Sequence, residues 1–197
     1  MPVTQTATAP AQGTRARVER AALDLFTRRG FENVTTDEVA DAAGISRRTF
    51  FRYYATKADA VWGDFAGHVV RLEELLAATD AARPVLPSVC SAYVQVNDYG
   101  DAQLPLLRER MQLILTEPAL LAHSQLRFAE VDRVVARYVA GRTGDSPTAL
   151  VPRLVAATTR AAATTAFQAW LADERSSLAG QLHHAFDELT AGFPTLR

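Results

Sequence analysis

Three arginines stand within six residues of one another, interleaved with aromatic side chains: Arg47, Arg48 and Arg52. Guanidinium groups this close together repel one another unless an anion faces them. Arginine donates two hydrogen bonds to O6 and N7 of guanine in the major groove, and it also binds phosphate oxygens well. The stretch therefore favours binding to double-stranded DNA, with Arg47 and Arg48 as candidate base contacts. The alternative is an ordinary solvated basic surface.

Hydroxyl and cationic side chains around these arginines are further candidate DNA contacts. They are Thr36, Ser46, Thr49, Arg52, Tyr53 and Lys57. Thr49 could equally serve only to cap its helix. Lys57 is the only lysine in the chain, and it falls near a predicted helix start, where a cation opposes the helix dipole. Phosphate binding beside exposed backbone N–H groups would explain that position. Phe50 and Tyr54 are expected in the core, whereas Phe51 has no assigned role.

Capping signals predict the elements that position the arginines. Thr35 and Glu38 form a Thr-x-x-Glu capping box, which predicts a helix over 36–43. Gly44 can take the left-handed conformation that closes this helix. Ser46 is a preferred N-cap, so a short, arginine-rich helix is expected to follow it.

Two longer helices are predicted on either side of this pair. Apolar residues at helical spacing predict the first over 14–30, ending at Gly30. Thr56 and Asp59 form a second capping box, which predicts one continuous fourth helix up to about residue 78. Residues 14–57 therefore have the layout of a helix-turn-helix DNA-binding domain.

The rest of the chain, residues 58–197, is predicted to be entirely helical. After the fourth helix, the expected helices cover 88–98, 105–115, 118–140, 147–171 and 177–192. Ser146 is expected to cap the helix from Pro147, although Pro152 could delay its start. Residues 1–13 are expected to be a disordered tail. No strand pattern is found, so the predicted fold class is all-α.

Composition and charge set the remaining bounds. The net charge of −1 divides unevenly: residues 15–57 hold nine basic and six acidic side chains, and residues 58–197 hold twelve and sixteen. The basic excess therefore falls on the predicted DNA-binding domain. The single cysteine, Cys90, excludes an internal disulfide and is expected to be buried packing. The sequence suggests neither a signal peptide nor a membrane span, so a cytoplasmic protein is expected.

These motifs resemble the N-terminal domain of the TetR family of transcriptional regulators. The resembling positions are Thr35-Thr36, Val39-Ala40, Ala43-Gly44-Ile45-Ser46, Thr49-Phe50, Tyr53-Tyr54 and Thr56-Lys57. A similarity to the branch found with mycofactocin biosynthesis genes extends over Ser46–Tyr54, Trp62–Phe65, Leu113–Leu115, Pro118–Leu120 and Trp170–Asp173. Arg48 stands where many family members have glycine, and Phe51 where many have tyrosine, so a phosphate contact through a tyrosine hydroxyl is not transferable to Phe51.

The resemblance implies a homodimeric regulator, in keeping with a repressor, on a pseudo-palindromic DNA operator. It implies a C-terminal domain for ligand binding and dimerisation, in which the last two helices pack as a four-helix bundle. The small side chains of 147–171 make that helix and 177–192 the candidates for the dimer contact. For the mycofactocin-linked branch, the implied effector is a long-chain acyl-CoA.

Candidate effector contacts are aromatic, apolar or cationic residues of the C-terminal part. They are Trp62, Phe65, Tyr93, Met111, Arg127, Phe128, Phe167 and Trp170. An aromatic stripe at helical spacing can equally be core. No cofactor or metal site is expected, since the chain shows no cluster of metal-ligand residues at a usable spacing. An enzyme with a scattered active site and a DNA-binding protein that ignores small molecules remain the alternatives.

Overall fold

The computed structural model describes residues 9–194, and within that range all regular structure is helical. This confirms the predicted all-α class. The chain divides into two compact units. Among the described residues, the first consists of those up to Asp64 together with 112–121, and the second of Phe65–Met111 and those from Ala122 onward.

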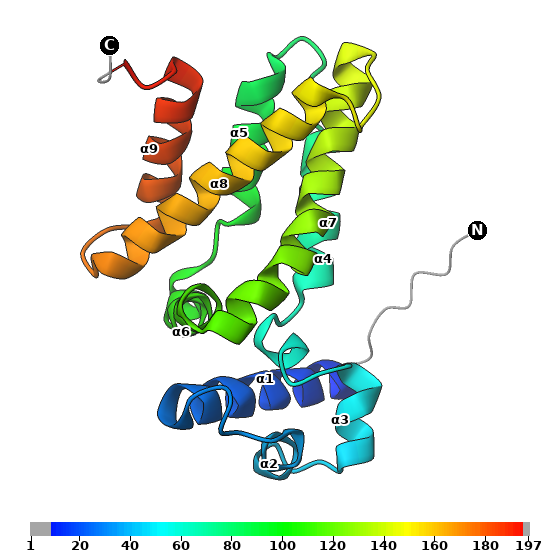
Figure 1. The fold of residues 1–197 in the computed structure, drawn as a ribbon, viewed down its shortest axis with the longest axis vertical. Helices are drawn as coiled ribbons and strands as arrows, with labels where there is room; N and C mark the ends of the chain where they lie inside the picture. The colour runs from blue at the N-terminus through cyan, green and yellow to red at the C-terminus, as the bar shows by residue number, and fades with distance from the viewer. Residues whose placement is uncertain (1–8, 195–197) are drawn as a thin grey trace. The chain divides into compact units, whose positions relative to one another are not determined.

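The part of the first unit that precedes Phe65 contains three helices and one 3₁₀ turn among the described residues (Figure 1). They are α1 (Ala9–Arg29), α2 (Thr36–Ala42), α3 (Arg47–Tyr53) and η1 (Asp59–Val61). Their inner faces close over a small apolar core that includes Val18, Phe26, Val39 and Phe50, each at most 1% exposed. Fully burying a side chain such as Phe50 contributes about 1.5–3 kcal/mol. A seven-residue helix such as α3 is therefore held by packing rather than by its own helix propensity.

The predicted caps of this unit are confirmed. The Thr35 side chain accepts from the Glu38 N–H, and the Glu38 carboxylate accepts from the Thr35 N–H at 2.8 Å. Ser46 accepts from the Thr49 N–H at 3.1 Å. Gly44 takes a φ of 67°, the left-handed conformation that was expected of it.

The prediction of one continuous fourth helix from Thr56 to about residue 78 is wrong. The Thr56–Asp59 capping box forms, with the Thr56 N–H donating to Asp59 at 2.9 Å, but it begins only the short turn η1. Gly63 then adopts a φ of 62°, which an α-helix cannot contain, and α4 begins anew at Phe65 and runs to Ala77. The backbone freedom of this glycine lets the chain change direction there.

The start of the chain also differs from expectation. Helix α1 begins at Ala9, so it includes the end of the 1–13 segment that was expected to be disordered. Residues 1–8 lie outside the described range. Alanine and glutamine in 9–13 are compatible with a helix once α1 is fixed by its packed face.

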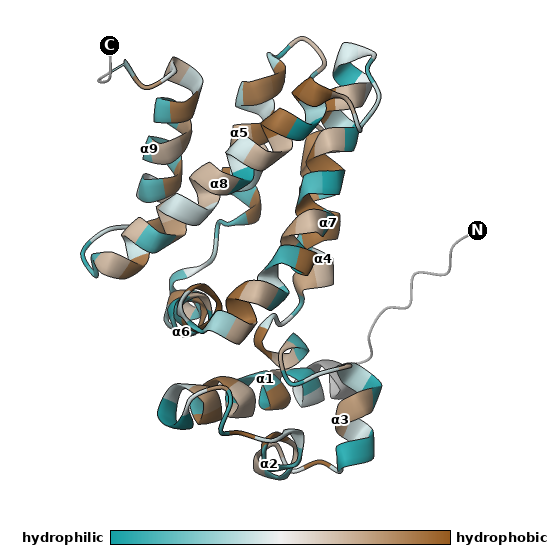
Figure 2. Cartoon of the chain, in the orientation of Figure 1, coloured by the Kyte–Doolittle hydropathy of each residue, from teal (hydrophilic) through white to brown (hydrophobic). Residues whose placement is uncertain are grey.

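The remaining elements lie in the second unit, except that residues 112–121, at the end of α6 and the start of α7, belong to the first. They are α4 (Phe65–Ala77), α5 (Val85–Val96), the 3₁₀ turn η2 (Asp101–Gln103), α6 (Leu104–Thr116), α7 (Pro118–Thr143), α8 (Leu150–Ala172) and α9 (Leu178–Ala191). Helix α8 packs along α9, both contact α5, and α5 packs against α4 (Figure 1). Figure 2 shows hydrophobic and hydrophilic residues alternating along these helices, as expected when each has one buried face. Cys90 is buried, as predicted.

Two boundaries in this unit correct the expectations. Helix α7 continues to Thr143, so most of the expected loop from Gly141 is helical. Helix α8 begins at Leu150 with Ala149 as its N-cap, not at Pro147 with Ser146. A start at Pro147 would place Pro152 in the helix interior, where it lacks the N–H for a backbone hydrogen bond. The observed start keeps Pro152 in the first turn, where no such bond is needed.

Candidate nucleic-acid interface

Arg47, the first residue of α3, is held by an acidic residue of α2. Its Nη1 lies 2.7 Å from both carboxylate oxygens of Asp37. The same guanidinium lies over the ring of Phe51, 5.2 Å from the ring centre. Phe51 is 44% exposed. Arg47 and Phe51 therefore form one exposed, stacked pair on the outer face of α3.

Arg48 is exposed and makes no hydrogen bond, ion pair or ring contact with the part of the chain that the structure describes. Figure 2 shows the start of α3 as hydrophilic and its middle as hydrophobic. Phe50, on the inner side, is fully buried and meets the Phe51 ring edge-on at 5.5 Å. The helix thus turns its aromatic core inward and presents Arg48 outward.

Two further arginines surround Tyr53 at the end of α3. Arg52 donates to the Tyr53 hydroxyl at 3.2 Å and lies 5.0 Å from the centre of its ring. Arg15, from α1, lies 5.5 Å from the same centre. The three side chains form a cationic group suited to a phosphate. Arg15 was not among the predicted residues, because nothing in the sequence says that the start of α1 meets the end of α3.

The predicted hydroxyl contacts divide into two places. Ser46 and Thr49 lie 2.9 Å apart at the start of α3, oxygen to oxygen, and both are engaged in its cap. Thr36 is the first residue of α2 and half-buried. Asp37 follows it, so the start of α2 carries a carboxylate beside the expected path of the DNA backbone.

Lys57 points toward the loop between α1 and α2. Its ammonium donates to the carbonyl oxygens of Phe31 at 2.7 Å and Val34 at 2.9 Å, and it lies 4.3 Å from the centre of the Phe31 ring. Two of its three N–H groups are thus used inside the protein.

The loop between α1 and α2 is held from a second side by the capping box. Arg29 at the end of α1 pairs with Glu38 at 2.7 Å. The pKa of Glu38 is lowered to about 2, first because the Thr35 N–H donates to its carboxylate, and also because Arg29 and the Thr35 hydroxyl donate to it. The ionised carboxylate of Glu38 therefore joins α1 to α2, the two helices against which α3 packs.

The predicted effector residues do not form one group. Trp62 belongs to the first unit and is buried there. Phe65 stacks on His68 at 6.0 Å and has Arg127 5.9 Å from its ring centre, while Arg127 also approaches Glu130 at 3.7 Å.

Other predicted effector residues lie deeper in the second unit. Phe167 and Trp170 are buried neighbours on α8, 6.2 Å apart. Arg108 of α6 stacks on Trp170 at 4.1 Å and donates to its carbonyl oxygen at 2.9 Å. Tyr93 packs on Phe186 of α9 at 5.7 Å, and burial raises its pKa.

Phe128 and Met111 complete this set of predicted effector residues. Phe128 has the guanidinium of Arg160 5.8 Å from its ring centre, and Arg160 itself pairs with Asp132 at 2.9 Å. Met111 is half-buried on α6. The structure thus distributes the predicted residues over several contacts among α4, α5, α6, α7, α8 and α9.

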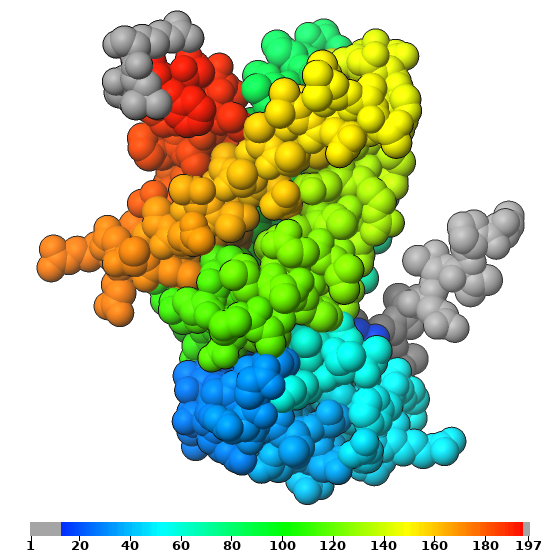
Figure 3. Space-filling model, viewed as in Figure 1, coloured from blue at the N-terminus to red at the C-terminus, as the bar shows by residue number. Residues whose placement is uncertain are grey.

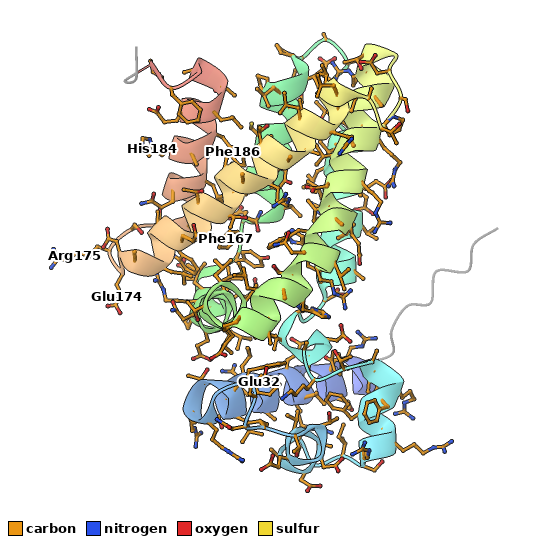
Figure 4. The ribbon with its side chains drawn as sticks, in the orientation of Figure 1. Glu32, Phe167, Glu174, Arg175, His184 and Phe186 are labelled. Atoms are coloured by element: carbon orange, nitrogen blue, oxygen red, sulfur yellow. The ribbon has the colours of Figure 1, made fainter. Side chains whose placement is uncertain are left out.

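Two open grooves lie on the second unit, and none of the predicted effector residues lines either one. One, of about 540 Å³, runs between α7 and the start of α8. The other, of about 470 Å³, runs between α8 and α9 and is lined largely by small side chains. Helices α8 and α9 lie side by side on the face seen in Figure 3. His184, which lines the second groove, and the buried Phe186 lie on opposite sides of α9 (Figure 4).

The described residues before Phe65 form three α-helices, and the last of them presents arginines outward. This is the arrangement of a helix-turn-helix DNA-binding domain. Such a domain followed by a helical second unit is typical of helix-turn-helix transcriptional regulators. Residues 20–60 match the model of the bacterial regulatory proteins of the tetR family. Residues 83–194 match the model of the MftR C-terminal domain. The chain belongs to the TetR family of transcriptional regulators, which confirms the resemblance found in the sequence.

A relative supports the assignment to the mycofactocin-linked branch. The chain is 38% identical over 183 residues to the "Putative mycofactocin biosynthesis transcriptional regulator MftR" of Mycobacterium tuberculosis. The match covers 93% of this chain and 92% of the relative. It therefore extends through both units.

Solved structures of low sequence identity share the fold. One is Thermus thermophilus FadR, a TetR family transcriptional repressor in complex with lauroyl-CoA, with a TM-score of 0.56, 23% identity, and coverage of 89% of this chain and 93% of that one. Another is SmeT, the repressor of a Stenotrophomonas maltophilia multidrug efflux pump, in complex with triclosan. Its TM-score is 0.63 at 17% identity, and the match covers 91% of this chain and 90% of that one.

No helix among the described residues is both long and apolar enough to cross a membrane.

Proposed function

We propose that the protein is a cytoplasmic, homodimeric repressor that binds a pseudo-palindromic DNA operator and is released by a small-molecule effector. The observation that carries the proposal is α3, a short helix held by the buried Phe50. It presents Arg48 outward, and Arg48 has no side-chain partner within the described range. Membership of the TetR family supports the same role for this helix. In a dimer, two such helices about 34–36 Å apart would enter successive major grooves.

The DNA contacts are assigned by the surroundings of each side chain. Arg48 and Arg47 lie at the start of α3, which is the end that meets base edges in this motif. Ser46, Thr49 and Thr36 offer hydroxyls at two helix starts, and Arg52 with Tyr53 and Arg15 forms the cationic group for a phosphate. Lys57 holds the loop between α1 and α2 and keeps one N–H for the backbone of the DNA.

The dimer is assigned to α8 and α9. Their shared groove is lined by Ala161, Ala162, Ala166, Ala169 and Ala185 among others, and small side chains let two helices approach closely. A second copy laying its own α8 and α9 there would build a bundle of four helices. The exposed Phe193 borders the same groove and would be covered by the partner.

The effector class is assigned as a long-chain acyl-CoA. Support comes from the match to the MftR C-terminal domain and from the fold shared with FadR bound to lauroyl-CoA. Arg108, Arg127 and Arg160 each stack on an aromatic ring of the second unit. Cationic and apolar groups side by side are what an anionic ligand with an apolar tail requires.

The test begins with selection of bound duplexes from a random DNA pool, and affinity for the selected duplex is then measured by fluorescence anisotropy. Lauroyl-CoA and palmitoyl-CoA should weaken binding, whereas free coenzyme A and free fatty acid serve as controls. Failure to enrich any sequence would overturn the assignment as an operator-binding regulator. Enrichment with an affinity that acyl-CoA leaves unchanged would favour the alternative, a regulator independent of this ligand.

A further inference from the structure

Asp37 occupies an unexpected place for an acidic residue in a DNA-binding surface. It lies in the first turn of α2, and its carboxylate accepts from Arg47 of α3 with both oxygens at 2.7 Å. The two side chains are 55% and 62% exposed. An ion pair this exposed contributes little to stability, because water solvates both partners and side-chain entropy opposes the pairing. The main effect of this ion pair is therefore on the position of the Arg47 side chain.

The capping of α2 does not need Asp37. Thr35 and Glu38 already satisfy the start of that helix through their reciprocal capping box. The favourable interaction of an acid with the helix dipole is likewise supplied by Glu38 in the same turn. A carboxylate at this place also repels the phosphates that the start of α2 would otherwise attract.

The pairing with Asp37 fixes where the Arg47 guanidinium stands. It holds that group 5.2 Å above the exposed ring of Phe51, and the ring is supported from below by the buried Phe50 at 5.5 Å. An arginine at a helix start with no such partner is free to reach the nearest phosphate. Here the guanidinium and the ring form one preorganised surface with a hydrogen-bond donor edge beside an apolar edge.

We infer that Asp37 is a specificity-determining positioning residue of the operator complex: it keeps Arg47 stacked on Phe51 and away from the phosphate backbone. The surface so fixed is suited to a guanine beside a thymine, the guanidinium bonding to the guanine edge and the Phe51 ring touching the thymine 5-methyl group. Asp37 thereby lowers affinity for DNA in general and raises discrimination among sequences. This inference rests on the proposed function of α3 in operator binding.

Removing only the charge of Asp37 should raise the affinity for unrelated DNA and lower the discrimination between DNA sequences. In Asp37→Asn, Arg47 gains a phosphate contact, so affinity for an unrelated duplex rises and the slope of log K against log salt steepens by about one unit. Discrimination between the selected duplex and the unrelated one falls by roughly tenfold, the size of one lost base contact. A residue that merely supported the fold would weaken binding to both duplexes.

Asp41→Asn is the matched control. Asp41 lies on the same helix, is exposed, and makes no side-chain pair within the described residues. Its replacement changes the net charge equally and should leave the discrimination ratio and the salt slope near those of the unmodified protein. If Asp37→Asn and Asp41→Asn gave the same ratio and slope, the inference would be overturned.

A double-mutant cycle separates this inference from the proposed function. Because Asp37 acts through Arg47, Asp37→Asn should no longer change the salt slope once Arg47→Ala is present. A change of the same size in both backgrounds would contradict the inference and leave operator binding intact. If the unmodified protein discriminated no duplex at all, the proposed function itself would fail, a result visible before any variant is made.

Discussion

The ammonium group of Lys57 lies 2.7 Å from the carbonyl oxygen of Phe31 and 4.3 Å from the centre of that residue's ring. The only lysine of the chain thus joins the segment after α3 to the loop between α1 and α2. A second bond, to the Val34 carbonyl at 2.9 Å, completes the contact. Lys57 contributes to the position of α3 whether or not it also touches DNA.

Lys57→Met should therefore destabilise the N-terminal unit. The substitution keeps most of the aliphatic chain but leaves two carbonyl oxygens without their donor, at a cost of about 1–3 kcal/mol. Chemical denaturation followed by circular dichroism measures the change. A matched Arg48→Met variant should keep the parent stability, because Arg48 has no side-chain partner among the residues that the structure describes. Equal stability of the two variants would contradict the role given to Lys57.

Arg48→Ala should weaken operator binding without affecting the fold. A lost bidentate contact with guanine costs about 1–3 kcal/mol on the selected duplex and relaxes preference at one base pair. Repeating the selection with the variant would show that relaxed position. An unchanged sequence profile would remove Arg48 from the base contacts, even if overall affinity fell.

Gly44→Ala should destabilise the first unit through backbone strain alone. Gly44 has a φ of 67°, and a Cβ there would meet nothing within 4 Å, so no clash contributes. The expected cost is about 1–2 kcal/mol. Gly13→Ala is the control: its Cβ also meets nothing within 4 Å, but it lies in α1 at an ordinary φ, so the variant should gain up to about 1 kcal/mol. Destabilisation of similar size in both variants would contradict this account of Gly44.

The first unit should lose stability in acid because of Glu38. Its folded pKa of about 2 lies below its ordinary value of 4.5, so its contribution is complete above pH 4.5 and is lost as the pH falls toward 2. Urea unfolding at a series of pH values would measure this loss. In Glu38→Gln the stability should vary less over that range, since no group with this lowered pKa remains. A pH dependence identical to that of the parent would contradict the assignment.

Ala161→Arg should convert the proposed dimer to a monomer. Ala161 is exposed and lines the groove between α8 and α9, so a long cation there would block the approach of a second copy. Sedimentation velocity at micromolar concentration measures the result. Ala129→Arg on the exposed side of α7 is the control and should remain dimeric. A dimeric Ala161→Arg variant would place the dimer contact elsewhere.

Short-range sequence signals are enough to predict the local elements of the first unit. The Thr35–Glu38 capping box, the Ser46 N-cap and the left-handed Gly44 each depend on residues within a few positions of one another. Such signals can be read before the fold is known. The burial of Phe50 was likewise predictable from helical periodicity. The close spacing of these residues also indicated the resemblance to the TetR family.

Breaks and boundaries were less predictable. The Thr56–Asp59 box is real, but a capping box signals only where a helix begins and not how far it runs. Gly63 is tolerated within many helices, so its left-handed φ here depends on the packing around it.

The long-range partners of the charged side chains depend on how the helices pack, which the sequence does not reveal. Asp37 meets Arg47 ten residues away, and Lys57 meets Phe31 twenty-six residues away, because the packing of α1, α2 and α3 brings these positions together. Arg15 reaches Tyr53 for the same reason. A charged side chain can face solvent, bind a phosphate or pair with another residue of the protein. The free energies of these three arrangements differ little. The packed core selects among them, and it leaves Arg48 of α3 without a side-chain partner in the described part of the chain.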